Sequence, residues 1–196
     1  MENHYKAWKK AFLEYNINIK ENQYYQLEGS KLIEIAKLIL LENKQSINLA
    51  ESIVQKKEFY YNSNIKIHFY KDVIKIINYL QTIYFLGIVT ATKRKTFEKT
   101  IPKNFKKNFK VIITGDDTEY GKPSPEPYLL AAKKLNKKIS NCIVIENAPL
   151  GIISAKKAGM FCIAISSTVV KSHLTKADII IDKFNDILKL NVINKF

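Results

Sequence analysis

Residues 142–151 read Cys-Ile-Val-Ile-Glu-Asn-Ala-Pro-Leu-Gly, an apolar run that ends in a carboxylate, an amide and a proline. A short apolar run that is rich in β-branched residues predicts a buried strand. Residues 151–158 follow with helical spacing and are closed by a glycine, which predicts a helix. This stretch is therefore a strand–turn–helix unit, with Glu146 and Asn147 at the carboxyl end of its strand.

Units of the same kind lie on both sides of this stretch. Runs of β-branched and aromatic residues predict strands at residues 85–89, 109–113, 142–145, 161–165 and 178–181. Helical periodicity predicts helices at 72–80, 126–135 and 151–158. Strands that alternate with helices favour a parallel sheet covered by helices on both faces, a three-layer Rossmann-like α/β core. We expect this core over residues 68–196.

The first third of the chain shows only the helical period. Apolar residues recur at intervals of three and four in three segments, at residues 7–15, 32–39 and about 46–61. Between the first two segments, Gly29 is expected to break a helix and Ser30 to cap the next one. A bundle of this size has little core of its own. We therefore expect residues 1–67 to form a small helical domain docked on the α/β core.

Ligands of such sheets bind beyond the carboxyl ends of the strands, where three polar segments fall. Their candidate residues are Thr90, Ala91, Thr92, Lys122, Glu146 and Asn147. A lone threonine after a strand is usually a turn residue, and a lone glutamate there is as often a helix cap. Lys122 is a sharper candidate, because its loop at residues 121–127, Gly-Lys-Pro-Ser-Pro-Glu-Pro, is stiff enough to aim an ammonium group with little further loss of entropy.

In their order and spacing, the three segments resemble motifs II, III and IV of the haloacid-dehalogenase-like (HAD) phosphotransferases, most closely the β-phosphoglucomutase-like phosphatases. The resemblance extends from His4 to Asp186. It implies a Mg²⁺-dependent hydrolase of a small phosphorylated metabolite, such as a sugar phosphate. In that family the lysine neutralises the transferring phosphoryl group, which implies a catalytic role for Lys122. Thr90, Ala91, Thr92 and Lys122 are then expected to hold the phosphate.

The resemblance also implies the metal ligands and the cap. Mg²⁺ would take oxygen ligands from Glu146 and from Asn147, which stands where the family usually has a second acid and so adds no charge. The helical region resembles a C1-type cap, and it implies substrate contacts by His4, Trp8, Glu28, Gly29 and Lys57. Leu32 falls about where some sugar phosphomutases place an arginine. This favours a phosphatase over a phosphomutase, which stays the alternative.

The first motif of the family, an apolar strand that runs into Asp-x-Asp, is not found in the sequence. The resemblance implies that this segment supplies the nucleophile and that its strand lies between those ending at Val89 and Ile145. Three explanations stay open: a truncated chain or misassigned start, a split or degraded gene, and a non-catalytic binder of phosphorylated ligands (a pseudoenzyme). We expect no appreciable activity from the chain by itself, and a complementing N-terminal segment as its partner.

The composition of the chain argues against nucleic-acid binding and against a membrane span. The 196 residues carry a formal net charge of +14, yet Arg94 is the only arginine and the lysines are scattered. Because nucleic-acid surfaces favour arginine, we expect a solvated surface and no nucleic-acid partner; a functional basic face is the alternative. No apolar run approaches the ~20 residues that cross a bilayer, so a cytoplasmic monomer without a membrane partner is expected. Cys142 and Cys162 lie in apolar runs, which predicts buried free thiols.

Overall fold

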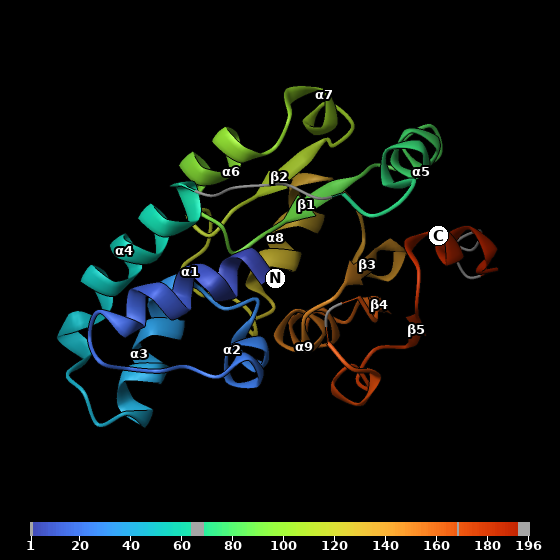
Figure 1. The fold of residues 1–196 in the computed structure, drawn as a ribbon. Helices are drawn as coiled ribbons and strands as arrows, with labels where there is room; N and C mark the ends of the chain where they lie inside the picture. The colour runs from blue at the N-terminus through green and yellow to red at the C-terminus, as the bar shows by residue number, and fades with distance from the viewer. Residues whose placement is uncertain (1, 64–68, 168, 192–196) are drawn as a thin grey trace.

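The computed structural model describes residues 2–63, 69–167 and 169–191. The chain forms a helical part and an α/β part, and the two lie side by side (Figure 1). The boundary predicted at residue 67 lies outside the described residues. Along the described parts of the chain, no helix has the length and apolar character that crossing a membrane requires.

Four helices make up the helical part. They are α1 (Glu2–Leu13), α2 (Glu21–Leu27), α3 (Leu32–Glu42) and α4 (Ala50–Ser63), and the 3₁₀ turn η1 (Ile47–Leu49) leads into the last of them. Their apolar faces meet in one core, where Trp8, Phe12, Ile39 and Ile53 are fully buried. The three helices predicted here are present. Helix α2 was not predicted, because seven residues are too few to display a helical period.

The α/β part contains a strand at each of the five predicted places. The strands are β1 (Gly87–Val89), β2 (Val111–Ile113), β3 (Ile143–Glu146), β4 (Phe161–Ile165) and β5 (Ile179–Ile181). The helices are α5 (Val73–Leu80), α6 (Arg94–Thr100), α7 (Lys103–Lys106), α8 (Glu126–Lys134) and α9 (Pro149–Lys157), with 3₁₀ turns η2 (Ile139–Asn141), η3 (Lys171–His173) and η4 (Phe184–Lys189).

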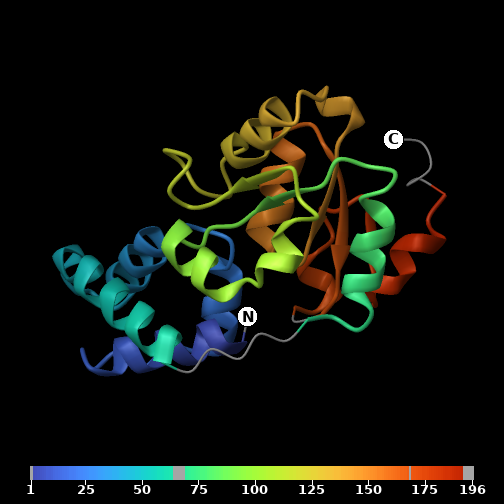
Figure 2. The ribbon, with the colours of Figure 1, turned by 90° about the horizontal axis from the view of Figure 1, so that it is seen from above.

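Helices cover both faces of the larger group of strands. On one face, Val144 and Cys162 pack with Tyr128 of α8 and Ile152 of α9. On the other face, the side chains that alternate with these along the strands pack against α5 and η4. Figure 2 shows α5 on the opposite side of the strands from α9. The predicted three-layer α/β fold is therefore confirmed.

The sheet itself is in two pieces. Strands β1 and β2 pair in parallel, with Ile88 opposite Ile112, and β3, β4 and β5 form a second parallel sheet with Ile145 opposite Ile163. Within the described residues, one edge of β1 and one edge of β3 have no ladder partner. The apolar side chain of Ile145 is accordingly 38% exposed. The carboxyl ends of β1 and β3 approach each other at Lys122, whose ammonium contacts both the carbonyl of Val89 and the carboxylate of Glu146.

The loop after α2 joins the helical part to the core. Gly29 adopts a φ of +103°, which a residue with a side chain rarely adopts. The next residue, Ser30, donates its hydroxyl to the carbonyl of Lys122 at 3.1 Å. The prediction that Ser30 caps α3 is therefore wrong: Lys31 is the N-cap residue, and its N–H donates to Glu34 at 3.2 Å. The serine hydroxyl instead holds the helical part against the loop at residues 121–127, which carries Lys122.

The single arginine has a structural role. The Arg94 guanidinium donates to the carbonyl of Ile112 at 3.0 Å and to Asp117 at 2.5 Å, while the Arg94 N–H donates to Asp116 at 2.7 Å. Asp117 also accepts the hydroxyl and N–H of Thr114, both at 2.7 Å. Helix α6 is thus tied to the turn after β2.

Both cysteines are free thiols. Cys162 is buried in β4, and this burial raises its pKa to about 12. Cys142 lies just before β3 and is only partly buried, with its thiol directed at the carbonyl of Lys138 at 3.3 Å. The prediction of free thiols is confirmed, and full burial holds for Cys162 alone.

Candidate phosphate site

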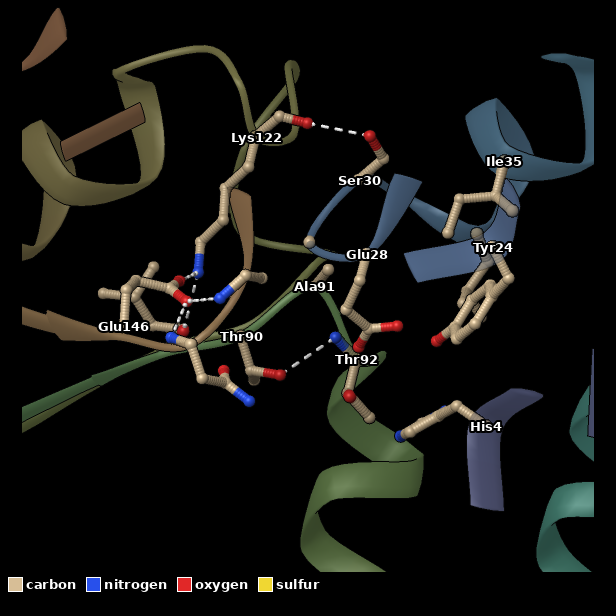
Figure 3. Close-up of a pocket in the computed structure, with 15 residues that line it drawn as sticks. His4, Tyr24, Glu28, Ser30, Ile35, Thr90, Ala91, Thr92, Lys122 and Glu146 are labelled. Carbon is tan, nitrogen blue, oxygen red and sulfur yellow. Dashed lines mark hydrogen bonds and ion pairs between the residues drawn. The ribbon is translucent and has the colours of Figure 1, made fainter. Parts of the chain in front are cut away.

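A pocket of about 170 Å³ lies at the carboxyl ends of β1 and β3, between the α/β part and the helical part (Figure 3). The structure brings nine of the predicted site residues to its lining: His4, Glu28, Gly29, Thr90, Ala91, Thr92, Lys122, Glu146 and Asn147. Segments that are far apart in the sequence therefore converge on one polar cleft.

Lys122 provides the cation on the core side of the pocket. The residue is 5% exposed, and its ammonium group donates to Oε1 of Glu146 and, at 3.4 Å, to the carbonyl of Val89. The same ammonium lies 4.9 Å from the centre of the Tyr128 ring. These contacts hold the charge at the end of β1, as the stiff proline-rich loop predicts.

Glu146 is the anchor of this arrangement. Its Oε1 also accepts the Tyr128 hydroxyl at 2.7 Å, and its Oε2 accepts the N–H groups of Asn147 at 2.9 Å and Ala148 at 3.1 Å. Burial pushes the pKa of this carboxyl upward, but attraction to Lys122 and the hydrogen bonds outweigh burial and lower the pKa below its usual value. Glu146 is therefore ionised, and it holds Lys122 in place.

The turn between β3 and α9 depends on Gly151. A Cβ atom at this position would collide with the carboxylate of Glu146. Only the absence of a side chain lets the carboxylate reach the N–H groups at the start of α9. The glycine that closes the 142–151 stretch thus has a direct consequence for the site.

Tyr128 is a site residue that the sequence analysis missed. It is 6% exposed, and its pKa is raised well above 10 by burial and by the neighbouring charge of Glu146. A buried tyrosine hydroxyl needs a hydrogen-bond partner. In the sequence, Tyr128 comes directly after Pro127, the last residue of the proline-rich loop. This closeness to Lys122 was the signal that could have identified Tyr128 as a site residue.

The predicted Mg²⁺ ligands do not form a metal site by themselves. Both oxygens of Glu146 are engaged by donors, including a cation, and Asn147 adds an amide oxygen without charge. Residues 2–63, 69–167 and 169–191 contain no group of three or more acidic, histidine or cysteine side chains that would hold a metal ion. The present residues therefore do not fit Mg²⁺ without further ligands.

Thr90 lies in a tight turn after β1. Its N–H continues the ladder to the carbonyl of Ile113 at 2.9 Å, and its hydroxyl oxygen accepts the N–H of Thr92 at 3.1 Å. A hydroxyl that accepts in this way keeps its own proton for another acceptor. Thr90 can therefore donate to an oxyanion in the pocket, next to the ammonium of Lys122.

The helical side of the pocket holds Glu28 and His4. One carboxylate oxygen of Glu28, Oε2, is buried and has no hydrogen-bond partner within the described residues. Burial raises the pKa of Glu28 to about 7, although Lys57 opposes this. Burial, with Lys57 nearby, lowers the pKa of His4 well below its usual value. His4 is neutral at pH 7 and stacks on Tyr61 with ring centres 4.1 Å apart.

Two of the predicted cap residues lie behind the pocket. Trp8 is fully buried in the helical core, where its ring stacks on Phe12, so the predicted substrate contact of Trp8 is not available in this geometry. Lys57 is 2% exposed and lies over the rings of Trp8 and Tyr61. Burial lowers the pKa of Lys57 to about 8. Lys57 does not line the pocket, but its charge acts on Glu28 and His4, which do.

Chemically, the pocket combines a fixed ammonium, a hydroxyl donor and the turn after β1, which together suit an oxyanion such as a phosphoryl group. Glu146, the carboxylate next to Lys122, is engaged on both oxygens, and Glu28 lies on the other side of the pocket. The geometry of Lys122 and Thr90 thus suits the holding of a phosphoryl group.

Comparisons with known proteins identify similar phosphatases. The validoxylamine A 7′-phosphate phosphatase of Streptomyces hygroscopicus subsp. limoneus is 37% identical over 52% of this chain and 48% of that protein. Hexitol phosphatase A of Escherichia coli is 32% identical over 40% of this chain and 36% of that protein. The chain spans half or less of the length of these relatives.

Solved structures share the fold. The β-phosphoglucomutase of Clostridium difficile superposes with a TM-score of 0.83, covering 99% of this chain and 89% of that chain at 24% sequence identity. The sequence matches the haloacid dehalogenase-like hydrolase family over residues 1–165, more than four fifths of its length. The chain belongs to the haloacid dehalogenase-like hydrolases.

Proposed function

We propose that this chain carries the phosphate-binding half of a phosphatase site, and that its substrate is a small phosphorylated metabolite. The observation that carries the proposal is the convergence of Thr90, Lys122 and Glu146 in one pocket below the helical part. Family membership and the phosphatases among the relatives support it. A cytoplasmic location, a monomeric state and the absence of a nucleic-acid partner stay predictions.

Each residue has a distinct task in this proposal. Lys122 offsets the negative charge that develops on the phosphoryl oxygens, and Thr90 donates its hydroxyl to one of them. Glu146 and Tyr128 keep the ammonium group in place. The helical part closes the pocket, and its Ser30 fixes the Lys122 loop. None of these groups forms a bond to phosphorus.

The nucleophile is expected to arrive with a strand between β1 and β3. A parallel strand placed there would pair with both open edges, and its carboxyl end would arrive beside Thr90, Lys122 and Glu146. An aspartate at that end would attack phosphorus and release the alcohol, and water would then hydrolyse the aspartyl phosphate. Mg²⁺ dependence is usual in the family, and here the metal would need ligands from the same segment.

The test is an assay of the chain, residues 1–196, with p-nitrophenyl phosphate and Mg²⁺, paired with a binding titration of inorganic phosphate. We expect phosphate binding that Lys122→Ala abolishes and Lys134→Ala, a change on the exposed end of α8, preserves. Turnover should be negligible, because loss of a covalent nucleophile costs roughly 10⁴-fold or more. Strong turnover that Lys122→Ala removes would show that no added strand is needed. Absence of phosphate binding would refute the site.

A non-catalytic phosphate binder is the second candidate. The observation that favours it is the closed hydrogen-bond shell of Glu146, the carboxylate that pairs with Lys122. Such a protein would bind phosphate through Lys122 and stay inactive even after a strand with an aspartate is supplied. Activity that follows strand addition separates the phosphatase from this alternative.

A further inference from the structure

The two sides of the pocket differ in charge. The core side contains the ammonium of Lys122, whereas no lysine or arginine of the described helical part contributes to the lining. The two nearby lysines of that part are engaged elsewhere. Lys31 donates to the carbonyl of Thr118, and Lys57 is buried over two aromatic rings. Among the described residues, a second anionic group on the substrate would therefore find no lysine or arginine to contact in the lining on this side.

Glu28 occupies this side of the pocket instead. Figure 3 shows its carboxylate near Thr92 and His4, on the opposite side from the pair formed by Lys122 and Glu146. Its Oε2 is buried without a hydrogen-bond partner in the described residues. A buried polar atom that lacks a partner is costly, so a ligand that brings a donor relieves the cost.

We propose that Glu28 selects the substrate by its end remote from the phosphoryl group, and that this end carries hydroxyl groups and no second phosphate. The inference rests on the proposed function, because it assumes that the phosphoryl group is held at Lys122. The substrate class is then a polyol or sugar monophosphate. Bisphosphates, and with them phosphomutase chemistry through a bisphosphate, are disfavoured by the carboxylate.

Two physical effects act in the same direction. A hydroxyl of the ligand donates to the carboxylate of Glu28, which lines the pocket and makes no hydrogen bond through its Oε2, and so lowers the cost of keeping that group partly buried. Above pH 7, where Glu28 is ionised, a second phosphate would instead place two negative groups together in a partly enclosed pocket, where charges are screened less than in water. Leu32 and Ile35, which line the pocket on the same side, offer no donor to compensate.

The experiment is a titration of the full chain at pH 8, where Glu28 is ionised, with four ligands: inorganic phosphate, hexyl phosphate, sorbitol 6-phosphate and glucose 1,6-bisphosphate. We expect sorbitol 6-phosphate to bind about three- to tenfold more tightly than hexyl phosphate and more tightly than the bisphosphate. Glu28→Gln, which keeps the shape, should raise the relative affinity for the bisphosphate. Glu28→Lys should reverse the order, and Glu51→Lys on the exposed face of α4 should not.

The outcomes separate the inference from the function on which it rests. If inorganic phosphate does not bind, or binds independently of Lys122, the proposed function fails. If phosphate binds through Lys122 but the bisphosphate binds as tightly as sorbitol 6-phosphate, the inference alone is overturned. An affinity ratio that Glu28→Gln leaves unchanged would overturn it as well, and circular dichroism of that variant establishes that it is folded.

Discussion

A methyl group at position 151 would occupy the space that the Glu146 carboxylate fills. We expect Gly151→Ala to displace this carboxylate from the N–H groups of Asn147 and Ala148 and to release Lys122. Stability should fall by about 1–3 kcal/mol, and inorganic phosphate should bind more weakly. Urea unfolding and a phosphate titration measure both effects.

Gly87→Ala is the matched control for this prediction. A Cβ there would meet the side chain of Leu135 at 3.5 Å, an ordinary contact, so the change should alter stability by only about 0.5 kcal/mol. Equal losses in the two variants would mean that the close approach of Gly151 to Glu146 has no special role.

The buried carboxyl of Glu28 gives the stability of the protein a definite pH dependence. Its folded pKa of about 7 lies above the ordinary value of 4.5, so the folded state holds the proton more firmly and loses stability as pH rises from about 4.5 to 7. Glu28→Gln removes this loss. The variant should therefore be the more stable one at pH 8, by on the order of 2 kcal/mol, with no such gain at pH 4.

Urea unfolding of both proteins between pH 4 and pH 8 measures this difference. Among the described residues, the charged groups that act on Glu28 are Lys57 of α4, Lys122 of the loop at residues 121–127 and Glu146 of β3. A stability difference that is the same at pH 4 and pH 8 would show that Glu28 has an ordinary pKa in the folded protein.

At the scale of elements, the strands and the longer helices could be predicted from the sequence, and the short helices could not. The five strands were placed within two residues of their observed ends, because β-branched runs such as 161–165 are strong local signals. Helices α2, α6 and α7 contain seven, seven and four residues, too few for a period to emerge. The N-cap at Ser30 was wrong because its hydroxyl bonds to Lys122, 92 positions away.

Some residues of the candidate site could likewise be predicted from the sequence, and others could not. Thr90, Lys122 and Glu146 follow strands, and parallel strands bring their carboxyl ends to one edge, so their convergence could be derived from order alone. The hydrogen bond of Tyr128 to Glu146 and the unpartnered Oε2 of Glu28 could not be predicted, because both depend on how the helices pack. Trp8 carries no periodic signal that distinguishes a core residue from a pocket residue, and the structure places it in the core.

At the scale of the whole molecule, we propose that the division of the sheet into two pieces governs activity. Val89 and Glu146, at the ends of β1 and β3, both line the pocket, so on this proposal one added strand extends both ladders and delivers a carboxylate to the site. Stability and activity should therefore increase together, since both effects arise from the same segment.

The most direct measurement supplies that strand. A segment of about six apolar residues ending in Asp-x-Asp is joined upstream of residue 1, and melting temperature and Mg²⁺-dependent phosphatase activity are measured against the unextended chain. We predict that both increase, that Asn-x-Asn in the same segment keeps the higher melting temperature without activity, and that Lys122→Ala removes the activity. An extended protein that is no more stable and stays inactive would contradict the account.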